Sequence, residues 1–177
     1  MYTVEYKLKS LSPYIQNNPA AVIEDIKNRT TRTPVGKKEQ DALKTGFKNE
    51  DGYFIPSKQF RGAMLMAGKK VKLGKGSIFN LLKACLFFDG QENVMARKGR
   101  PLKEPDFIYN DPILKPPPKS DMVFNPRVAF SGWETTIKVN ILEDSIPEEK
   151  IHEVLAYAGL YVGVGSRRPE FGRFQVV

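Results

Sequence analysis

Residues 135–161 read TTIKVNILEDSIPEEKIHEVLAYAGLY, and they contain a strand pattern followed directly by a helix pattern. Over residues 135–142 alternate side chains belong to opposite faces, which is the period of a half-buried strand. Ser145-Ile-Pro-Glu148 then fits a capping box with proline in the first helical turn. The helix that follows has one continuous apolar stripe, made of Ile151, Val154, Leu155, Ala158 and Tyr161. A strand followed by a helix with one apolar face predicts a layered α+β domain.

Four further elements are expected before and after this unit. Residues 2–9 alternate between apolar and polar side chains, which predicts a strand near the start of the chain. Ser57 is expected to cap a helix, and Ser77 a second one. The apolar positions of these two helices are Phe60, Met64 and Ala67 in the first and Ile78, Leu81, Leu82 and Cys85 in the second. Residues 173–177 predict a terminal strand.

Two long stretches, residues 10–52 and 89–132, have weaker patterns, and we expect them to be insertions. The first contains a short helical possibility at residues 20–26 and a basic segment at residues 28–38 with the composition of a loop. The second is rich in proline and lysine between short strand-like pieces. This composition predicts an extended excursion or a finger-like hairpin.

The order of the expected elements indicates the fold. It is strand, helix pair, irregular strands, strand, helix and strand, with a central pair of strands supplied by residues 89–132. This order predicts one domain over residues 1–177 with the β-α-β-β-α-β plan of a ferredoxin-like, RRM-related fold and an antiparallel sheet. Long basic loops would extend from it.

The charge of the chain predicts a polyanionic partner. The net charge is +8 and the sequence pI is about 9.5. Residues 58–75 hold six basic residues and no acidic one, whereas residues 134–153 hold six acidic residues and two lysines. A segment with purely basic side chains is the footprint that phosphate neutralisation requires, so nucleic acid is the expected partner.

The glycine-rich turn at residues 163–172 is the sharpest single feature. Its glycines allow positive φ and close approach of the backbone to a ligand, and consecutive N–H groups are able to form an anion nest. Arginine side chains there are expected to bind phosphates. Phe171 or Phe174 is expected to offer a stacking face for a base, with a core role for at least one of them. The start of the first expected helix also favours an anion. The expected nucleic-acid contacts are Ser57, Lys58, Arg61, Lys69, Lys70, Gly163, Gly165, Ser166, Arg167, Arg168, Phe171 and Arg173.

Catalytic equipment is sparse in the sequence. His152 is the single histidine and lies in the acidic helix, while Cys85 is the single cysteine and lies in an apolar run. One cysteine and one histidine do not build a zinc site, and no P-loop motif is present. We therefore expect neither a catalytic residue nor a metal nor a cofactor. Met1 leads directly into a strand pattern without a leader, and no apolar stretch is long enough to span a bilayer, which predicts a cytoplasmic protein with no membrane contact.

Three segments resemble the RAMP superfamily of CRISPR-associated proteins, and especially RAMP-type proteins of phages and prophages. They are Leu11-Ser-Pro-Tyr-Ile-Gln16, Tyr53-Phe-Ile-Pro-Ser-Lys-Gln-Phe-Arg-Gly-Ala63 and the C-terminal stretch Ala158–Phe174. The first departs from the family pattern at Ile15, where a serine is expected. The resemblance implies a ferredoxin-like domain that binds RNA and stacks along it as repeated subunits, with Ser57, Lys58, Arg61 and the glycine loop as contacts. The histidine of the superfamily's processing nucleases has no counterpart here.

The preferred hypothesis is a non-catalytic protein that reads the backbone of single-stranded RNA, in a bacterial cell, within a CRISPR-like or phage ribonucleoprotein assembly. Three alternatives stay open from the sequence. They are a phage single-stranded DNA-binding or annealing protein, an interaction protein that inhibits a CRISPR complex, and a metal-free endoribonuclease. Sensitivity to the 2′-OH group separates the first alternative from the preferred hypothesis.

Overall fold

The computed structural model describes residues 1–19, 42–114 and 122–177. The short helix expected at residues 20–26 and the basic loop expected at residues 28–38 lie outside the described residues. None of the helices in the described part of the chain has both the length and the apolar character needed to cross a bilayer.

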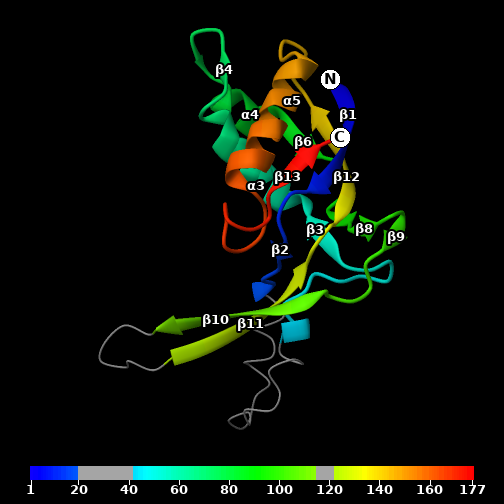
Figure 1. Ribbon diagram of the computed structural model, residues 1–177. Helices are drawn as coiled ribbons and strands as arrows, with labels where there is room; N and C mark the ends of the chain where they lie inside the picture. Colours follow the sequence, from blue (N-terminus) through cyan, green and yellow to red (C-terminus); the bar gives the residue numbers. More distant parts are fainter. Residues whose placement is uncertain (20–41, 115–121) are drawn as a thin grey trace.

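The central sheet is built around the two strands that the alternating patterns predicted. β1 (Tyr2–Ser10) pairs antiparallel with β12 (Glu134–Ile141) along its length and with β13 (Phe174–Val176) on its other edge. β12 also pairs antiparallel with β6 (Leu86–Phe88) and with β8 (Ala96–Arg97), which continues to β9 (Arg100–Pro101) (Figure 1). The sheet is therefore antiparallel throughout these pairs, as expected.

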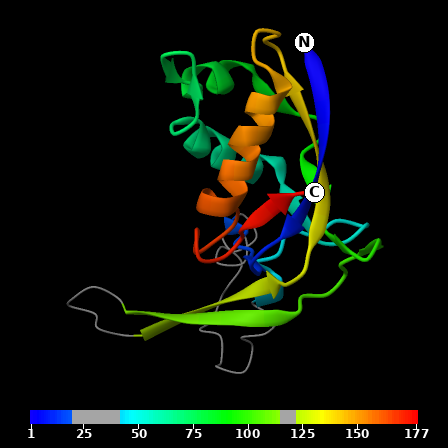
Figure 2. The same cartoon turned by 45° about the horizontal axis from the view of Figure 1, so that its top comes forward.

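The helices cover one face of this sheet (Figure 2). α3 (Ser57–Gly68), α5 (Glu148–Tyr157) and the π-helix η2 (Ala158–Val162) contact one another, and α4 (Phe79–Cys85) packs on α3. Aromatic rings fill the space beneath them: Phe60 of α3 meets Phe174 of β13 edge to face, with ring centroids 5.7 Å apart. Phe174 is fully buried, so the core role expected for one of the two C-terminal phenylalanines is confirmed for this residue.

The prediction that the serine side chains of Ser57, Ser77 and Ser145 cap three helices is wrong. The residues that precede α3, α4 and α5 are Pro56, Ile78 and Pro147, and no side chain caps any of the three helices. Proline suits this place because its missing N–H removes one unpaired donor, and its φ is already helical. Ser77 lies instead in the short strand β5 (Gly76–Ser77), which pairs with β4 (Lys72–Leu73).

The prediction that Tyr161 belongs to the buried apolar stripe is also wrong. Ile151, Val154, Leu155 and Ala158 are buried, but Tyr161 is 63% exposed. The reason is the change from α-helix to π-helix at Ala158, where the N–H of Gly163 donates to the carbonyl of Ala158, five residues earlier. A wider turn rotates Tyr161 away from the face that α-helical spacing assigns to it.

The central strand pair does not come from residues 89–132 as expected. β6 follows α4 directly, within the apolar run that the sequence assigned to the second helix. The Arg61 side chain of α3 donates to the carbonyl oxygens of Lys83 and Leu86, where α4 ends and β6 begins. The register of β6 against β12 then places Leu86 opposite Ile141 in the core.

The second half of residues 89–132 forms a finger-like hairpin, which was one of the two predicted arrangements. β10 (Phe107–Leu114) pairs antiparallel with β11 (Met122–Phe130), and β11 in turn pairs antiparallel with β2 (Tyr14–Ile15). In both views the hairpin projects away from the helices (Figures 1 and 2). β3 (Phe54–Pro56) and β7 (Glu92–Val94) make a separate antiparallel pair that leads into α3.

An ion pair closes the base of this hairpin. The Asp106 carboxylate accepts hydrogen bonds from the Arg97 guanidinium, at 3.0 and 2.5 Å, and from the N–H of Ser131, at 2.8 Å. Asp106 precedes β10 and Ser131 follows β11, so one carboxylate joins the two strand ends. Although partial burial acts to raise the pKa of Asp106, the bonds from Arg97 and Ser131 outweigh it and hold the pKa below 3.8.

We expect Asp106→Asn to lower the free energy of unfolding by at most about 1 kcal/mol at pH 7, because the pair is partly exposed. A lowered pKa contributes stability above the unfolded value of 3.8, and this contribution is lost as the pH falls through the folded value. Urea unfolding at pH 7 and below pH 4 measures the effect. The difference between wild type and variant should shrink at the lower pH, and a constant difference would contradict the assignment.

Candidate nucleic-acid interface

A basic hollow forms where the start of α3 meets the glycine-rich loop. It has a volume of about 300 Å³. The residues that line it come from three distant parts of the chain, and they are Asn17, Lys58, Gln59, Gly62, Gly165, Ser166 and Arg168. Lys58 and Arg168 are both exposed, and no acidic residue is among those seven. The structure thus brings one cation from each of the two predicted basic segments, Lys58 and Arg168, to one place.

The glycine loop is fixed by hydrogen bonds to the protein itself. The N–H of Ser166 donates to the carbonyl of Ile15 at 3.0 Å, and the N–H of Gly172 donates to the carbonyl of Pro13 at 2.7 Å. Across the loop, the N–H of Val164 donates to the carbonyl of Gly172 at 2.9 Å. These amides are not available to an anion, so the predicted nest of consecutive N–H groups is not present over this part of the loop.

The glycines serve close packing within the protein, and their expected contact with a ligand stays a prediction. Gly165 has φ +81°, and a Cβ atom there would lie 2.6 Å from the carbonyl oxygen of Ile15. Gly172 has φ +76°, and a Cβ atom would overlap the carbonyl oxygen of Val164. The buried Gly163 also has positive φ, at +73°. Because the loop is anchored in this way, it holds Ser166 and Arg168 at a fixed distance from α3.

Gln59 adds a neutral donor to the basic hollow. Its Oε1 accepts a hydrogen bond of 2.9 Å from the hydroxyl of Tyr14, which leaves the Nε2 amide as the group that donates. Tyr14 is fully buried, and this burial raises its pKa far above the usual value, so the hydroxyl stays neutral and keeps donating. The hollow therefore combines two cations with an oriented amide, a set that suits phosphate oxygens.

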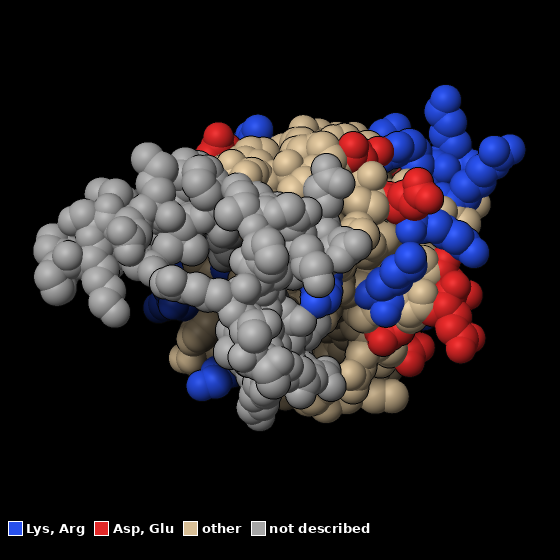
Figure 3. Space-filling model, turned by 90° about the horizontal axis from the view of Figure 1, so that it is seen from below, with Lys and Arg blue, Asp and Glu red and all other residues tan. Residues whose placement is uncertain are grey.

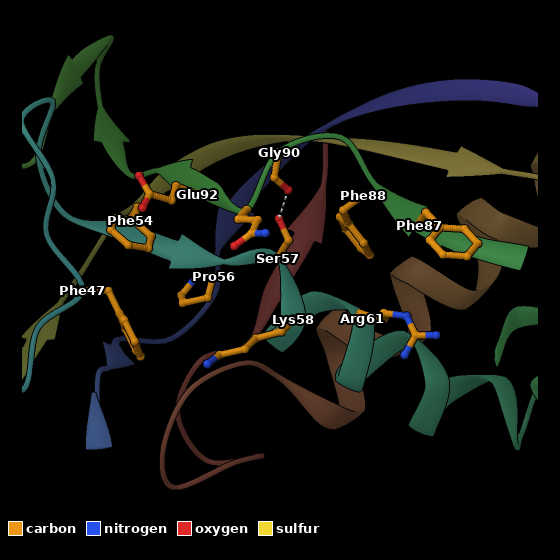
Figure 4. A pocket seen from close by; sticks show the side chains of 11 residues that line it. Phe47, Phe54, Pro56, Ser57, Lys58, Arg61, Phe87, Phe88, Gly90 and Glu92 are labelled. Carbon is orange, nitrogen blue, oxygen red and sulfur yellow. Dashed lines mark hydrogen bonds between the residues drawn. The ribbon is translucent and has the colours of Figure 1, made fainter. Parts of the chain in front are cut away.

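A second hollow, the aromatic pocket, also has Lys58 in its lining (Figure 4). Its volume is about 500 Å³. Its lining residues are Phe47, Phe54, Pro56, Ser57, Lys58, Arg61, Phe87, Phe88, Gly90, Gln91 and Glu92. Lys58 lines both hollows, so the aromatic pocket and the basic hollow adjoin at this side chain.

Ser57 and Arg61 line the aromatic pocket but are already engaged. The Ser57 hydroxyl donates to the carbonyl of Gly90 at 2.8 Å and accepts from the Nδ2 of Asn93 at 2.9 Å, and only 6% of the residue is exposed. The Arg61 guanidinium donates to the end of α4 at Lys83 and Leu86. In both residues these bonds support the fold, which the sequence patterns did not indicate.

The remaining predicted contacts lie outside the two hollows. Lys69 and Lys70 are at the far end of α3, roughly 16 Å from Lys58 along the helix axis, and the Lys69 Nζ lies 5.1 Å from the ring centroid of Phe79. Phe171 packs edge to face on Tyr109 of β10, with centroids 5.2 Å apart, so it links the glycine loop to the hairpin. Arg167 and Arg173, which lie near Phe171 in the sequence, have exposed side chains.

The charges are less segregated than the sequence predicts. Seen from below, basic and acidic side chains lie close together on the side of the molecule where β8 and β9 lie (Figure 3). Arg97 with Asp106 is one such pair. A lining with cations and no acidic side chain among the described residues is therefore a local property of the hollow beside α3, and the net charge alone does not indicate it.

Neither the single histidine nor the single cysteine of the sequence is among the described residues that line the two hollows. His152 is exposed on α5, and its ring centroid lies 6.0 Å from that of Tyr6 on β1. The Cys85 thiol is buried, and this burial raises its pKa, which is the opposite of an activated thiol. Among the described residues no three His, Cys, Asp or Glu side chains gather where a metal ion would bind.

Sequence reasoning missed several residues of this interface. Gln59 and Gly62 gave a usable signal, because they follow Lys58 at the start of α3, which the sequence indicated as favourable for an anion, and because Gly62 shares a face with Lys58 at i+4. Asn17 and the phenylalanines of the aromatic pocket gave none. Phe54 lies in β3, which pairs with β7, and Phe87 and Phe88 lie in β6, which pairs with β12; no local pattern encodes these pairings.

Comparison with known proteins gives a likeness in fold. No protein-family description and no curated protein matches the sequence. The structure is similar to the crystal structure of Cmr6 from Pyrococcus furiosus, with a TM-score of 0.51 and 11% sequence identity, over 99% of this chain and 98% of that one. This similarity shows that the two proteins share a fold.

Proposed function

We propose that the chain binds the sugar-phosphate backbone of single-stranded RNA in the basic hollow and performs no chemistry on it. The observation that carries the proposal is the meeting of Lys58 and Arg168 on the wall of one open hollow, with no acidic side chain among its described lining residues. Each cation neutralises a phosphate charge and releases condensed counterions, which is the main source of affinity for a nucleic acid backbone. Neutral donors from Gln59 and Ser166 add orientation.

We assign this activity to a subunit of a CRISPR-like or phage ribonucleoprotein assembly that is ferredoxin-like in its central plan. The fold shared with Cmr6 supports the first part. The pairing order β13-β1-β12-β6, with α3 and α5 between the paired strands in the chain, supports the second. The added pairs β3–β7 and β4–β5 and the β10–β11 hairpin are insertions into that plan.

The role is proposed to be binding alone because no histidine, aspartate or glutamate is among the described residues that line the hollow. Its lining offers lysine, arginine, serine and amide groups, and the histidine lies on α5 against Tyr6. Cleavage of RNA without a metal needs a group that removes the 2′-OH proton at the working pH. Incubation with labelled RNA in EDTA should leave the strand intact, and metal-free cleavage would contradict this part.

The test of the proposed function is a salt titration of binding to matched RNA and DNA oligomers of one sequence. We expect single-stranded RNA to bind with an affinity that falls steeply with salt, since each phosphate contact adds about 0.7 to the slope of log K against log salt. Tighter binding of RNA than DNA would support an RNA-directed role through the 2′-OH. Equal affinities would favour the DNA-binding alternative, and no binding at low salt would refute the proposal.

A further inference from the structure

The aromatic pocket has flat apolar walls on two sides. Phe47 and Phe54 lie together on one wall, with ring centroids 5.9 Å apart, and Phe87 and Phe88 of β6 lie on the other (Figure 4). Phe87 is 46% exposed and has no partner ring among the described aromatic pairs. Walls of this kind accept a planar apolar group between them.

The floor of the pocket is rigid and its polar groups are paired. Beside the Ser57 hydroxyl bonds, the Ser57 N–H donates to the carbonyl of Gln91 at 2.9 Å. Asn93 Nδ2 also donates to the carbonyl of Ile55 at 2.8 Å, and this tie joins β3 to β7 beneath the pocket. The cavity is therefore formed before any ligand arrives, so little ordering is needed on binding.

Charge divides the pocket into two ends. Lys58 and Arg61 stand on the α3 side, and the Lys58 Nζ lies 5.9 Å from the ring centroid of Phe47. Glu92 stands on the β7 side, where its Oε2 accepts a 2.7 Å hydrogen bond from Asn49 Nδ2. An anionic group is attracted to the α3 end and repelled from the β7 end. A ligand with a phosphate at one end and an uncharged ring at the other fits this polarity.

We propose that the aromatic pocket takes one unstacked nucleobase of the strand whose phosphate lies in the basic hollow. The inference rests on the proposed function, because Lys58 is shared by both hollows and places the base beside its own backbone. A pocket of about 500 Å³ is within the range that small planar ligands occupy. Stacking on phenylalanine tolerates any base, so the pocket adds affinity without strong sequence preference.

The test uses Phe47→Ala and Phe87→Ala, one substitution on each wall. The probes are an oligouridylate and an abasic strand of equal length with the same sugar-phosphate backbone. Leu142→Ala is the control, because Leu142 is an apolar residue of similar exposure, 50%, that does not line the pocket. We expect each phenylalanine variant to bind the oligouridylate about fivefold or more weakly, with unchanged affinity for the abasic strand and an unchanged salt slope.

The outcomes separate this inference from the function on which it rests. If the wild type binds oligouridylate and abasic strand equally, or if the variants bind oligouridylate as the wild type does, the base pocket is refuted while backbone binding stands. That second result would leave a protein side chain as the occupant of the pocket. If the wild type binds neither strand at low salt, the proposed function itself fails. Circular dichroism of each variant confirms that the fold is retained before affinities are compared.

Discussion

Replacing Lys58 and Arg168 together by alanine is expected to weaken binding of single-stranded RNA about tenfold or more, whatever its sequence. The two side chains are the cations of the basic hollow, and each is expected to contact a phosphate. A charge-assisted contact contributes roughly 1 kcal/mol or more, and two of them account for the loss. The salt slope should fall by about 1.4, because each lost contact with a single strand removes about 0.7.

The charge-matched control for this variant is Arg100→Ala with Lys103→Ala. Both residues are exposed cations at and just after β9, on the side of the molecule opposite the glycine loop (Figure 1). The control removes the same net charge, so a general loss of attraction would affect the two double variants alike. Filter binding over a range of salt concentrations measures both quantities. Equal slopes in the two double variants would contradict the assignment of the basic hollow.

Gly172→Ala is expected to cost roughly 3 kcal/mol or more of unfolding free energy. Two effects add: the residue has φ +76°, and its Cβ would overlap the backbone carbonyl of Val164. A backbone atom in a paired loop does not move aside as a flexible side chain does. The hydrogen bond from Gly172 to Pro13 would be strained as well.

Gly74→Ala is the matched control, since Gly74 has φ +62° but nothing within 4 Å of a Cβ atom. It keeps the cost of positive φ, about 1 kcal/mol, and removes the clash. Urea unfolding of both variants measures the difference, which we expect to be about 2 kcal/mol. Similar losses in the two variants would mean that the loop accommodates a methyl group. Because the loop carries Arg168, RNA binding should also fall in Gly172→Ala.

Sequence periodicity predicted the parts of the fold that depend on one local repeat. β1 and β12 alternate as expected, and α3 begins at Ser57 with its predicted apolar positions buried. A strand or helix must place an apolar face on the core, so the spacing of its apolar residues shows which element it forms. Clustered basic residues also pointed to the two segments that meet in the basic hollow.

The features that the sequence did not predict depend on contacts between distant residues. The hydroxyl of Ser57 is hydrogen-bonded to Gly90 and Asn93, and the guanidinium of Arg61 is hydrogen-bonded to the end of α4. The π-helix at Ala158 moved Tyr161 out of the core. None of these outcomes follows from the spacing of residues in one segment.

The sequence by itself determined the antiparallel α+β character, the basic segments and the glycine-rich loop. Only the tertiary structure decided that Lys58 and Arg168 share a hollow, that the loop glycines pack on Pro13, Ile15 and Val164, and that four phenylalanines wall a pocket beside Lys58. The physical reason is that periodicity records how one element meets the core. A site is made where several elements meet each other, and that meeting is set by the packing of the whole chain.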